Sequence, residues 1–146
     1  MPQSFPNIKR IAERTIGIEA DALLQLKKAI DKDFVNCVQA ISKSKVRVIV
    51  SGIGKSAIIA NKIVSTLNST GTPALFMHAA DAVHGDLGMI QKDDIIICIS
   101  KSGESPEIKL LIPLLKNSKN ILVAIVGNIN SSLAKQADFV LSTTVA

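Results

Sequence analysis

Short aliphatic runs alternate with helical segments along most of this chain, and that alternation limits the folds open to it. Runs such as Ile121–Val126 are rich in Ile and Val and are too short for a typical helix, which favours strands buried on both faces. The alternation predicts an α/β fold, a three-layer α/β/α sandwich around a five-stranded parallel sheet. The predicted strands are Val46–Ser51, Ala74–Met77, Asp94–Ser100, Ile121–Val126 and Phe139–Leu141.

A longer amphipathic segment precedes the first predicted strand. Its apolar residues recur at steps of three and four, which predicts a long helix with one apolar stripe. A shorter helix is predicted over Phe34–Ser42. A three-layer sandwich does not need the long helix, so we expect its stripe to pack on a partner subunit. The stripe consists of Ile8, Ala12, Ile16, Ala20, Leu23, Leu26 and Ile30.

Composition and charge narrow the classes of ligand. With 146 residues, 47% of them hydrophobic, the chain is long enough for one globular domain. Its formal net charge of +5 favours anionic ligands, but no basic run alternates with aromatic residues, so no nucleic acid partner is expected. No apolar run approaches the roughly 20 residues that span a bilayer, so no membrane association is expected. Cys37 and Cys98 match no metal or redox spacing, and buried, reduced thiols fit a cytoplasmic protein.

The segment 100–107, which reads SKSGESPE, follows the third predicted strand and carries the strongest functional signal. Serine is a good N-cap and Pro106 suits the first position of a helix, so a helix should begin here. Capping explains one serine, whereas three hydroxyls around Gly103 at a helix N-terminus are suited to a phosphate group. Those hydroxyls belong to Ser100, Ser102 and Ser105. Glu107, in the first helical turn, either complements the helix dipole or acts as a base beside the ligand.

A second turn of this kind, Ser51-Gly52-Ile53-Gly54-Lys55, follows the first predicted strand. It is not a Walker A loop, because the glycine required five residues before Gly54 is replaced by Ile49. A dinucleotide-binding loop should be followed by an acidic residue near the end of the next strand, whereas residues 72–78 contain none and Asp81 comes late. The glycines could serve only tight packing between strand and helix. Lys55 favours an anion site, because a buried cation at this position would otherwise be costly.

Both histidines of the chain follow the second predicted strand. His78 comes at its end, and His84 precedes Gly85 and Asp86, at the same sheet edge as the two turns. A loop histidine is commonly a satisfied surface or core group, and two histidines without a third close ligand make a poor structural zinc site. His84 is nevertheless placed to contribute to a site at this edge.

In these segments the chain resembles the sugar isomerase (SIS) domain, and more specifically the arabinose-5-phosphate isomerase family. The resemblance runs from about residue 13 to residue 146 and implies a flavodoxin-like SIS fold. It also implies interconversion of D-ribulose 5-phosphate and D-arabinose 5-phosphate, a precursor of the acid Kdo, without a required cofactor. The matching segments are 52–56 (GIGKS), 69–73 (STGTP), 84–89 (HGDLGM) and 100–105 (SKSGES).

The resemblance implies a role for each matching residue. Lys55, His84 and Glu107 match catalytic positions, and His84 also lies in the substrate site. His78 matches a substrate position where family members can bind a zinc ion, more often an inhibitor than a requirement. The remaining implied contacts are Ser100, Ser102, Gly103 and Ser105 to the phosphate, Ser51 and Gly52 beside it, and Gly71 and Thr72 lining the substrate pocket.

Aldose–ketose isomerisation moves a proton between C1 and C2 through an enediol. It needs a base, an acid for the oxygen atom and a cation or donor for the developing enolate charge. Glu107, His84 and Lys55 are suitable types for these roles, and the sequence leaves open which residue takes which role.

The expected unit is a single SIS domain over residues 1–146, with N-terminal helices over 1–45 and the sheet core over 46–146. Family members continue past this point with a further glutamate, a histidine and often two CBS modules, which this sequence does not show. The apolar stripe predicts a homo-oligomer, and the resemblance to the family implies a tetramer. Two alternatives stay open: a non-catalytic sugar-phosphate-binding regulatory module, and an isomerase of heptose or hexulose phosphates.

Overall fold

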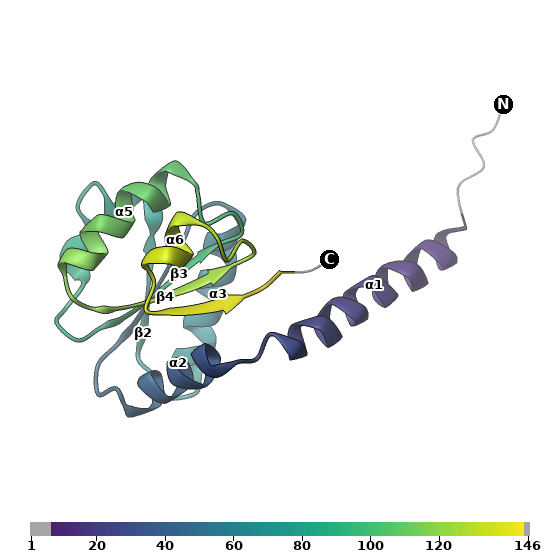
Figure 1. Ribbon diagram of the computed structural model, residues 1–146, viewed down its shortest axis with the longest axis horizontal. Helices are drawn as coiled ribbons and strands as arrows, with labels where there is room; N and C mark the ends of the chain where they lie inside the picture. The colour runs from purple at the N-terminus through teal and green to yellow at the C-terminus, as the bar shows by residue number, and fades with distance from the viewer. Residues whose placement is uncertain (1–6, 145–146) are drawn as a thin grey trace.

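The computed structural model describes residues 7–144 and contains one five-stranded sheet. All neighbouring strands are parallel, in the order β2-β1-β3-β4-β5. The predicted α/β class and parallel sheet are therefore confirmed (Figure 1). The strands are β1 (Val48–Gly52), β2 (Ala74–His78), β3 (Ile95–Ser100), β4 (Ile121–Val126) and β5 (Phe139–Ser142).

Helices cover both faces of the sheet because side chains of each strand point alternately to either side. Ile49 and Ile96 share one core with Leu111, on the face covered by α4, α5 and α6. Val50 and Ile97 share the other core, on the face covered by α2 and α3. The predicted three-layer sandwich is thus confirmed. The covering helices are α2 (Lys32–Lys43), α3 (Lys55–Ser69), α4 (Ala79–Ala82), α5 (Pro106–Asn117) and α6 (Ser132–Gln136).

The predicted long N-terminal helix is also present. Helix α1 (Ile8–Lys28) is capped by Asn7, whose side chain accepts a hydrogen bond from the Arg10 N–H, and none of the residues of α1 is buried. Figure 1 shows it projecting away from the sandwich. Leu23 is 69% exposed and Ile16 66%. Tertiary packing within one chain does not account for this apolar stripe.

Elsewhere the observed elements differ from the predicted ones mainly at their ends. Strand β1 begins at Val48 instead of Val46. Two short helices, α4 and the 3-10 helix η1 (Asp86–Met89), occupy a segment predicted only as a loop. Alanine is the strongest helix former, and α4 consists of three alanines and Asp81. The predicted strand order along the chain is unchanged by these additions.

An ion pair between half-buried Arg47 and a buried carboxylate lies at the edge of the sheet where the strands begin. Asp94 is fully buried, and its Oδ2 lies 2.7 Å from Nη2 of Arg47 and accepts a hydrogen bond from the Gln91 N–H at 2.8 Å. Burial by itself would raise the pKa of Asp94, but the hydrogen bonds from Arg47 and Gln91 outweigh it and lower that pKa. Asn120 donates to the backbone carbonyls of Gln91 and Asp94 at the same edge.

Both cysteines are buried and free, as predicted. Cys37 lies on α2, and Cys98 lies on β3 at the centre of the sheet. Burial raises the pKa of both thiols, that of Cys98 to about 12. A thiol protonated at neutral pH is a poor nucleophile and a poor metal ligand, so these residues act as small core side chains.

Candidate functional site

The two predicted anion-binding turns meet at the centre of the sheet. The chain leaves β1 toward α3 on one face and leaves β3 toward α5 on the other, and β1 and β3 are neighbouring strands. In open parallel sheets, such a point creates a crevice beyond the carboxyl ends of the strands, where ligands bind. Gly52, at the end of β1, pairs in register with Ile99 of β3 and with His78 of β2. The sheet therefore brings both turns and His78 to one edge.

We call residues 100–105 the serine turn. The Ser100 hydroxyl accepts a hydrogen bond from the Gly103 N–H at 3.1 Å, and the Ser102 hydroxyl accepts one from the Glu104 N–H at 3.2 Å. Ser105 is the N-cap of α5 but makes no side-chain cap bond. Its Oγ is buried and has no partner among the described residues. A buried hydroxyl without a partner at a helix N-terminus is suited to an anionic ligand.

The serine turn is held against the segment that follows β4. The Leu133 N–H donates to the Gly103 carbonyl at 3.2 Å, and the Gly127 N–H donates to the Lys101 carbonyl at 3.0 Å. Gly103 has φ +64°, a conformation that favours glycine. Residue 103 therefore allows the turn to curl back over the first turn of α6.

Glu104 is a site residue that the sequence reasoning missed. Its carboxylate accepts hydrogen bonds from the N–H and the hydroxyl of Ser132 and lies 2.6 Å from Nζ of Lys109. The side-chain hydrogen bond from Lys109, followed by those from Ser132, lowers the pKa of Glu104 to about 2. Its position in the sequence could have indicated this role. A carboxylate inside a turn suited to phosphate needs a cationic or hydrogen-bonding partner to offset its charge.

In the turn after β1, the glycine is explained by packing between strand and helix. A Cβ on Gly52 would lie 2.9 Å from the carbonyl carbon of Ser56, so this glycine permits the close approach of α3 to β1. Tight packing therefore accounts for Gly52. Ser51 is fully buried, and its Oγ has no partner within residues 7–144. In register with Cys98, Ser51 faces the layer that contains α5, as Ser100 does.

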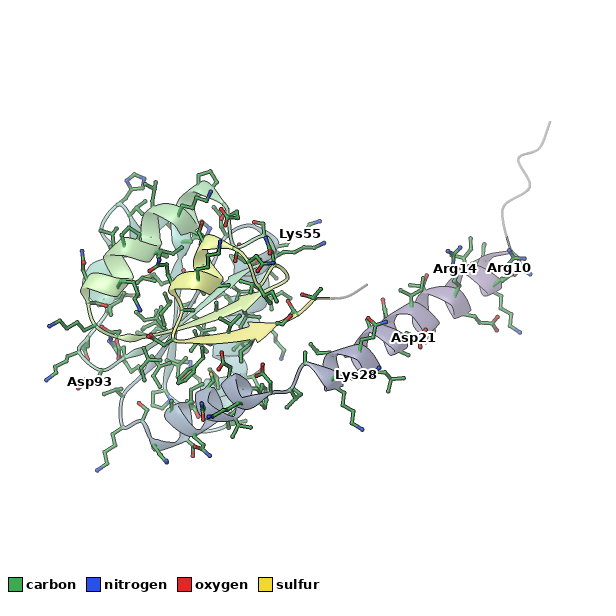
Figure 2. All side chains as sticks on the ribbon, viewed as in Figure 1. Arg10, Arg14, Asp21, Lys28, Lys55 and Asp93 are labelled. Atoms are coloured by element: carbon green, nitrogen blue, oxygen red, sulfur yellow. The ribbon has the colours of Figure 1, made fainter. Side chains whose placement is uncertain are left out.

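Lys55 is the first residue of α3 and is exposed. Figure 2 shows its side chain at the surface of the domain. The expectation that a cation here would be buried is wrong, because the turn presents residue 55 outside the strand–helix contact. An exposed ammonium group at the crevice remains available to an anionic ligand.

His78 is the last residue of β2, at the sheet edge where the two turns lie, and His84 follows α4. Nδ1 of His78 is 3.5 Å from Oδ2 of Asp81, and its ring lies edge-on to Phe76. His84 is exposed, and its N–H donates to the carbonyl of Asp81. In the part of the chain that the structure describes, no three His, Cys, Asp or Glu residues gather to hold a metal. His78 and Asp81 alone do not fit a structural zinc site.

Of the remaining predicted site residues, Glu107 lies at the sheet edge of the serine turn, whereas Gly71 and Thr72 lie at the opposite edge. Glu107 is half-buried in the first turn of α5, two residues after Ser105. Gly71 and Thr72 precede β2, which pairs at its start with Val48, so they lie at the opposite edge from the serine turn. A cavity of about 500 Å³ borders the serine turn and is lined by Lys101, Ser102, Gly127, Asn128, Thr143 and Thr144.

Comparisons with known proteins show which proteins this chain is similar to. Arabinose 5-phosphate isomerase KdsD of Pseudomonas aeruginosa is 46% identical over 134 residues, which cover 92% of this chain and 41% of that protein. The Escherichia coli O6:H1 isomerase KpsF is 45% identical over 142 residues, covering 97% of this chain and 43% of that protein. The chain thus spans about two fifths of the length of these curated relatives.

A solved structure matches over nearly the same range. The Escherichia coli CFT073 protein c3406, in complex with arabinose 5-phosphate, superposes with a TM-score of 0.82 and 37% sequence identity, covering 97% of this chain and 77% of that one. The family model of the SIS domain matches residues 40–146. The resemblance seen in the motifs is thereby confirmed, and the chain belongs to the SIS domain family.

Proposed function

We propose that this chain is the SIS domain of an arabinose 5-phosphate isomerase, which interconverts D-ribulose 5-phosphate and D-arabinose 5-phosphate. The observation that carries the proposal is the buried, unpartnered Ser105 hydroxyl at the N-terminus of α5, two residues before the half-buried carboxylate of Glu107. A phosphate group beside Ser105 would bring the carbon atoms of a short sugar toward an acid–base residue. The relatives named above as isomerases of this substrate support the assignment.

The serine turn supplies the phosphate site in this proposal. Ser100, Ser102 and Ser105 provide hydroxyls, and Gly103 provides a backbone free of side-chain bulk. The N-terminal N–H groups of α5 add the positive end of its dipole. Ser51 and Gly52 close the crevice from the neighbouring strand, and the unpartnered Ser51 hydroxyl is a further donor.

The proposed chemistry is a proton transfer between C1 and C2. Glu107 removes a proton from one carbon and returns it to the other, while His84 exchanges the oxygen proton. Lys55 stabilises the negative charge of the enediolate. Positioned acid–base groups typically contribute about 10²- to 10⁴-fold in rate, and a fixed cation contributes a comparable factor.

This reaction is redox-neutral, so we propose that it uses no organic cofactor. No acidic residue ends β2, where a dinucleotide-binding loop would need one, since β2 ends at His78. Among residues 7–144, no helix is long and apolar enough to cross a membrane. We place the reaction in the cytoplasm, with arabinose 5-phosphate used for Kdo in lipopolysaccharide or capsule synthesis.

We propose that the chain works as a homo-oligomer, a tetramer, in which α1 packs on a second copy. Most of the stripe, from Ile8 to Leu23, lies on a helix of 21 residues with no buried residue and packs on nothing in the described part of its own sandwich. At its end the stripe continues into an apolar groove of about 170 Å³ lined by Leu26, Ile30, Phe34 and Leu141, among others. Gly71 and Thr72, at the far edge of the sheet, could contact a substrate only from a neighbouring copy.

The alternative of a non-catalytic regulatory module is compatible with the fold. The Vibrio vulnificus NanR protein, complexed with ManNAc-6P, shares that fold with a TM-score of 0.83 at 18% identity. A regulatory module would need the two turns but not the acid–base residues. Lys55 and Glu107, which adjoin those turns in the sequence, and His84, which follows α4, are acid–base or cationic residues that favour the isomerase.

Proton NMR of ribulose 5-phosphate incubated with the chain in heavy water tests the proposal. We expect arabinose 5-phosphate to appear with deuterium incorporated at C2, because the transferred proton exchanges with solvent. Glu107→Gln serves as the control, and it should bind arabinose 5-phosphate without turning it over. Binding without exchange in the unsubstituted chain would favour the regulatory module, and neither binding nor exchange would refute the proposal.

A further inference from the structure

Glu104 poses an electrostatic problem at the proposed phosphate site. It stands between Gly103 and Ser105 in the serine turn, where a free carboxylate would repel a phosphate. Its side chain, however, is only 35% exposed, and its carboxylate is already engaged by an ammonium group and two hydrogen-bond donors. Lys109 and Ser132 provide all three contacts, and they belong to α5 and α6.

These contacts connect three separate segments. Lys109 lies in α5, immediately behind the serine turn, and its Nζ is 2.6 Å from Oε2 of Glu104. Ser132 is the first residue of α6, and its N–H and hydroxyl both donate to the carboxylate. Next to them, the Leu133 N–H donates to the Gly103 carbonyl. We call the set of Glu104, Lys109 and Ser132 the Glu104 clasp.

The clasp adds a side-chain restraint at residue 104 to the backbone hydrogen bonds that hold the turn against the segment after β4. Ser105 has no side-chain cap bond, and the serine hydroxyl bonds within the turn span only two or three residues. Without the clasp, nothing described would hold residue 104 against α6 except the single bond to the Gly103 carbonyl. Charge-assisted hydrogen bonds are roughly twice as strong as neutral ones, so the bonds to the carboxylate restrain the turn more than neutral bonds of the same geometry would.

We propose that Glu104 is a positioning residue that holds the serine turn in its phosphate-binding conformation without touching the phosphate. Its removal weakens binding of a phosphorylated sugar and leaves the proton-transfer step unchanged. This inference rests on the proposed function, because it assumes that the serine turn receives the phosphate. A purely structural role would instead lower stability while leaving affinity intact.

The chain contains a matched control for this distinction. Asp138 also pairs a carboxylate with a backbone N–H and a lysine of α5: its Oδ2 accepts from the Leu122 N–H at 2.8 Å and its Oδ1 lies 3.4 Å from Nζ of Lys116. It stands before β5, at the opposite edge of the sheet from the serine turn. Asp138→Asn and Glu104→Gln thus remove the same kind of charge at the two ends of the fold.

The experiment measures the Kd of arabinose 5-phosphate by calorimetry, and kcat and KM by the NMR assay. Glu104→Gln should raise Kd and KM about tenfold, below the roughly 100-fold that a 1 Å misplacement can cost, while kcat stays within about twofold. Asp138→Asn should leave all three unchanged. If Glu104→Gln fails to fold, Lys109→Met is the alternative variant. It removes the ion pair of the Glu104 clasp and should also raise Kd.

An unchanged Kd and KM in Glu104→Gln would overturn the inference, and so would a lower kcat at unchanged KM. If the unsubstituted chain binds no arabinose 5-phosphate, the proposed function fails by itself. Hydrogen exchange of the Gly103 and Glu104 amides, measured without ligand, then decides the positioning claim. Faster exchange in Glu104→Gln than in Asp138→Asn supports it, and equal exchange refutes it.

Discussion

A Cβ on Gly103 would lie 2.1 Å from Oγ of Ser131, closer than real Cβ contacts come. Ser131 is fully buried, and its hydroxyl accepts the N-cap bond from the Ala134 N–H of α6. The hydroxyl therefore cannot move aside without losing that bond. The serine turn and the start of α6 can touch only because residue 103 has no side chain.

Gly103→Ala should therefore destabilise the chain by about 2–4 kcal/mol, from the left-handed backbone together with overpacking. It should also abolish detectable binding of arabinose 5-phosphate. Chemical denaturation and calorimetry measure the two effects. Gly71→Ala is the stability control, because Gly71 has φ +91° with nothing within 4 Å of a Cβ, so only the backbone cost of about 1–2 kcal/mol applies. Equal losses in the two variants would contradict the steric explanation.

Lys55→Ala should lower kcat/KM by about 10²- to 10³-fold, the usual loss when one charge-stabilising group is removed from a site. Its free energy of unfolding should change by no more than about 0.5 kcal/mol, because Lys55 is exposed. Lys62→Ala, an exposed lysine of the same helix, is the matched control and should keep full activity. Normal turnover in Lys55→Ala would remove this residue from the proposed mechanism.

Arg47→Met should lower the free energy of unfolding by about 3 kcal/mol, because it leaves the buried carboxylate of Asp94 without its cation. Urea denaturation measures this loss. Lys9→Met, which breaks an exposed pair with Glu13 at 3.7 Å, should cost no more than about 0.5 kcal/mol. Similar values for both substitutions would mean that Asp94 is satisfied by the backbone N–H groups alone.

Stability should fall as the pH decreases from about 4.5 toward 2. The pKa of Glu104 is lowered to about 2 by Lys109 and Ser132, and the pKa of Asp94 is lowered by Arg47 and Gln91 despite its burial. In the unfolded chain, both groups take up protons at their ordinary, higher pKa, so protonation favours unfolding in this range. Denaturation at pH 7, 4.5 and 3 should show the decline, and Glu104→Gln should show a smaller one. A flat profile would contradict the lowered pKa values.

The features that could be predicted from the sequence are those set by local or periodic patterns of residues. Strands, covering helices and the serine turn follow from alternating apolar runs and from serine, glycine and proline at a strand end. The clasp and the Arg47–Asp94 pair were not predictable, since they join residues whose proximity depends on the completed sheet. The exposure of Lys55 was misjudged because a position next to glycines does not fix the direction of its side chain.

The same limit applies to α1, whose periodicity predicted a stripe but not its surroundings. Arg10, Arg14, Asp21 and Lys28, labelled in Figure 2, recur at steps of four and seven and form the polar face of α1. Ile16 and Leu23 lie on the other side and are mostly exposed. The described chain thus presents an amphipathic helix whose apolar side meets solvent, and this exposed stripe is the basis of the proposed subunit contact.

Leu23→Glu should therefore convert the proposed tetramer into smaller species, because it places a charge in the apolar stripe, where burial against a second copy would be costly. Sedimentation velocity at micromolar concentration measures the change. Lys28→Gln alters the net charge by the same amount on the polar face and should sediment like the unsubstituted chain. A monomeric unsubstituted chain would refute the proposed role of α1, as would an unchanged oligomer in Leu23→Glu.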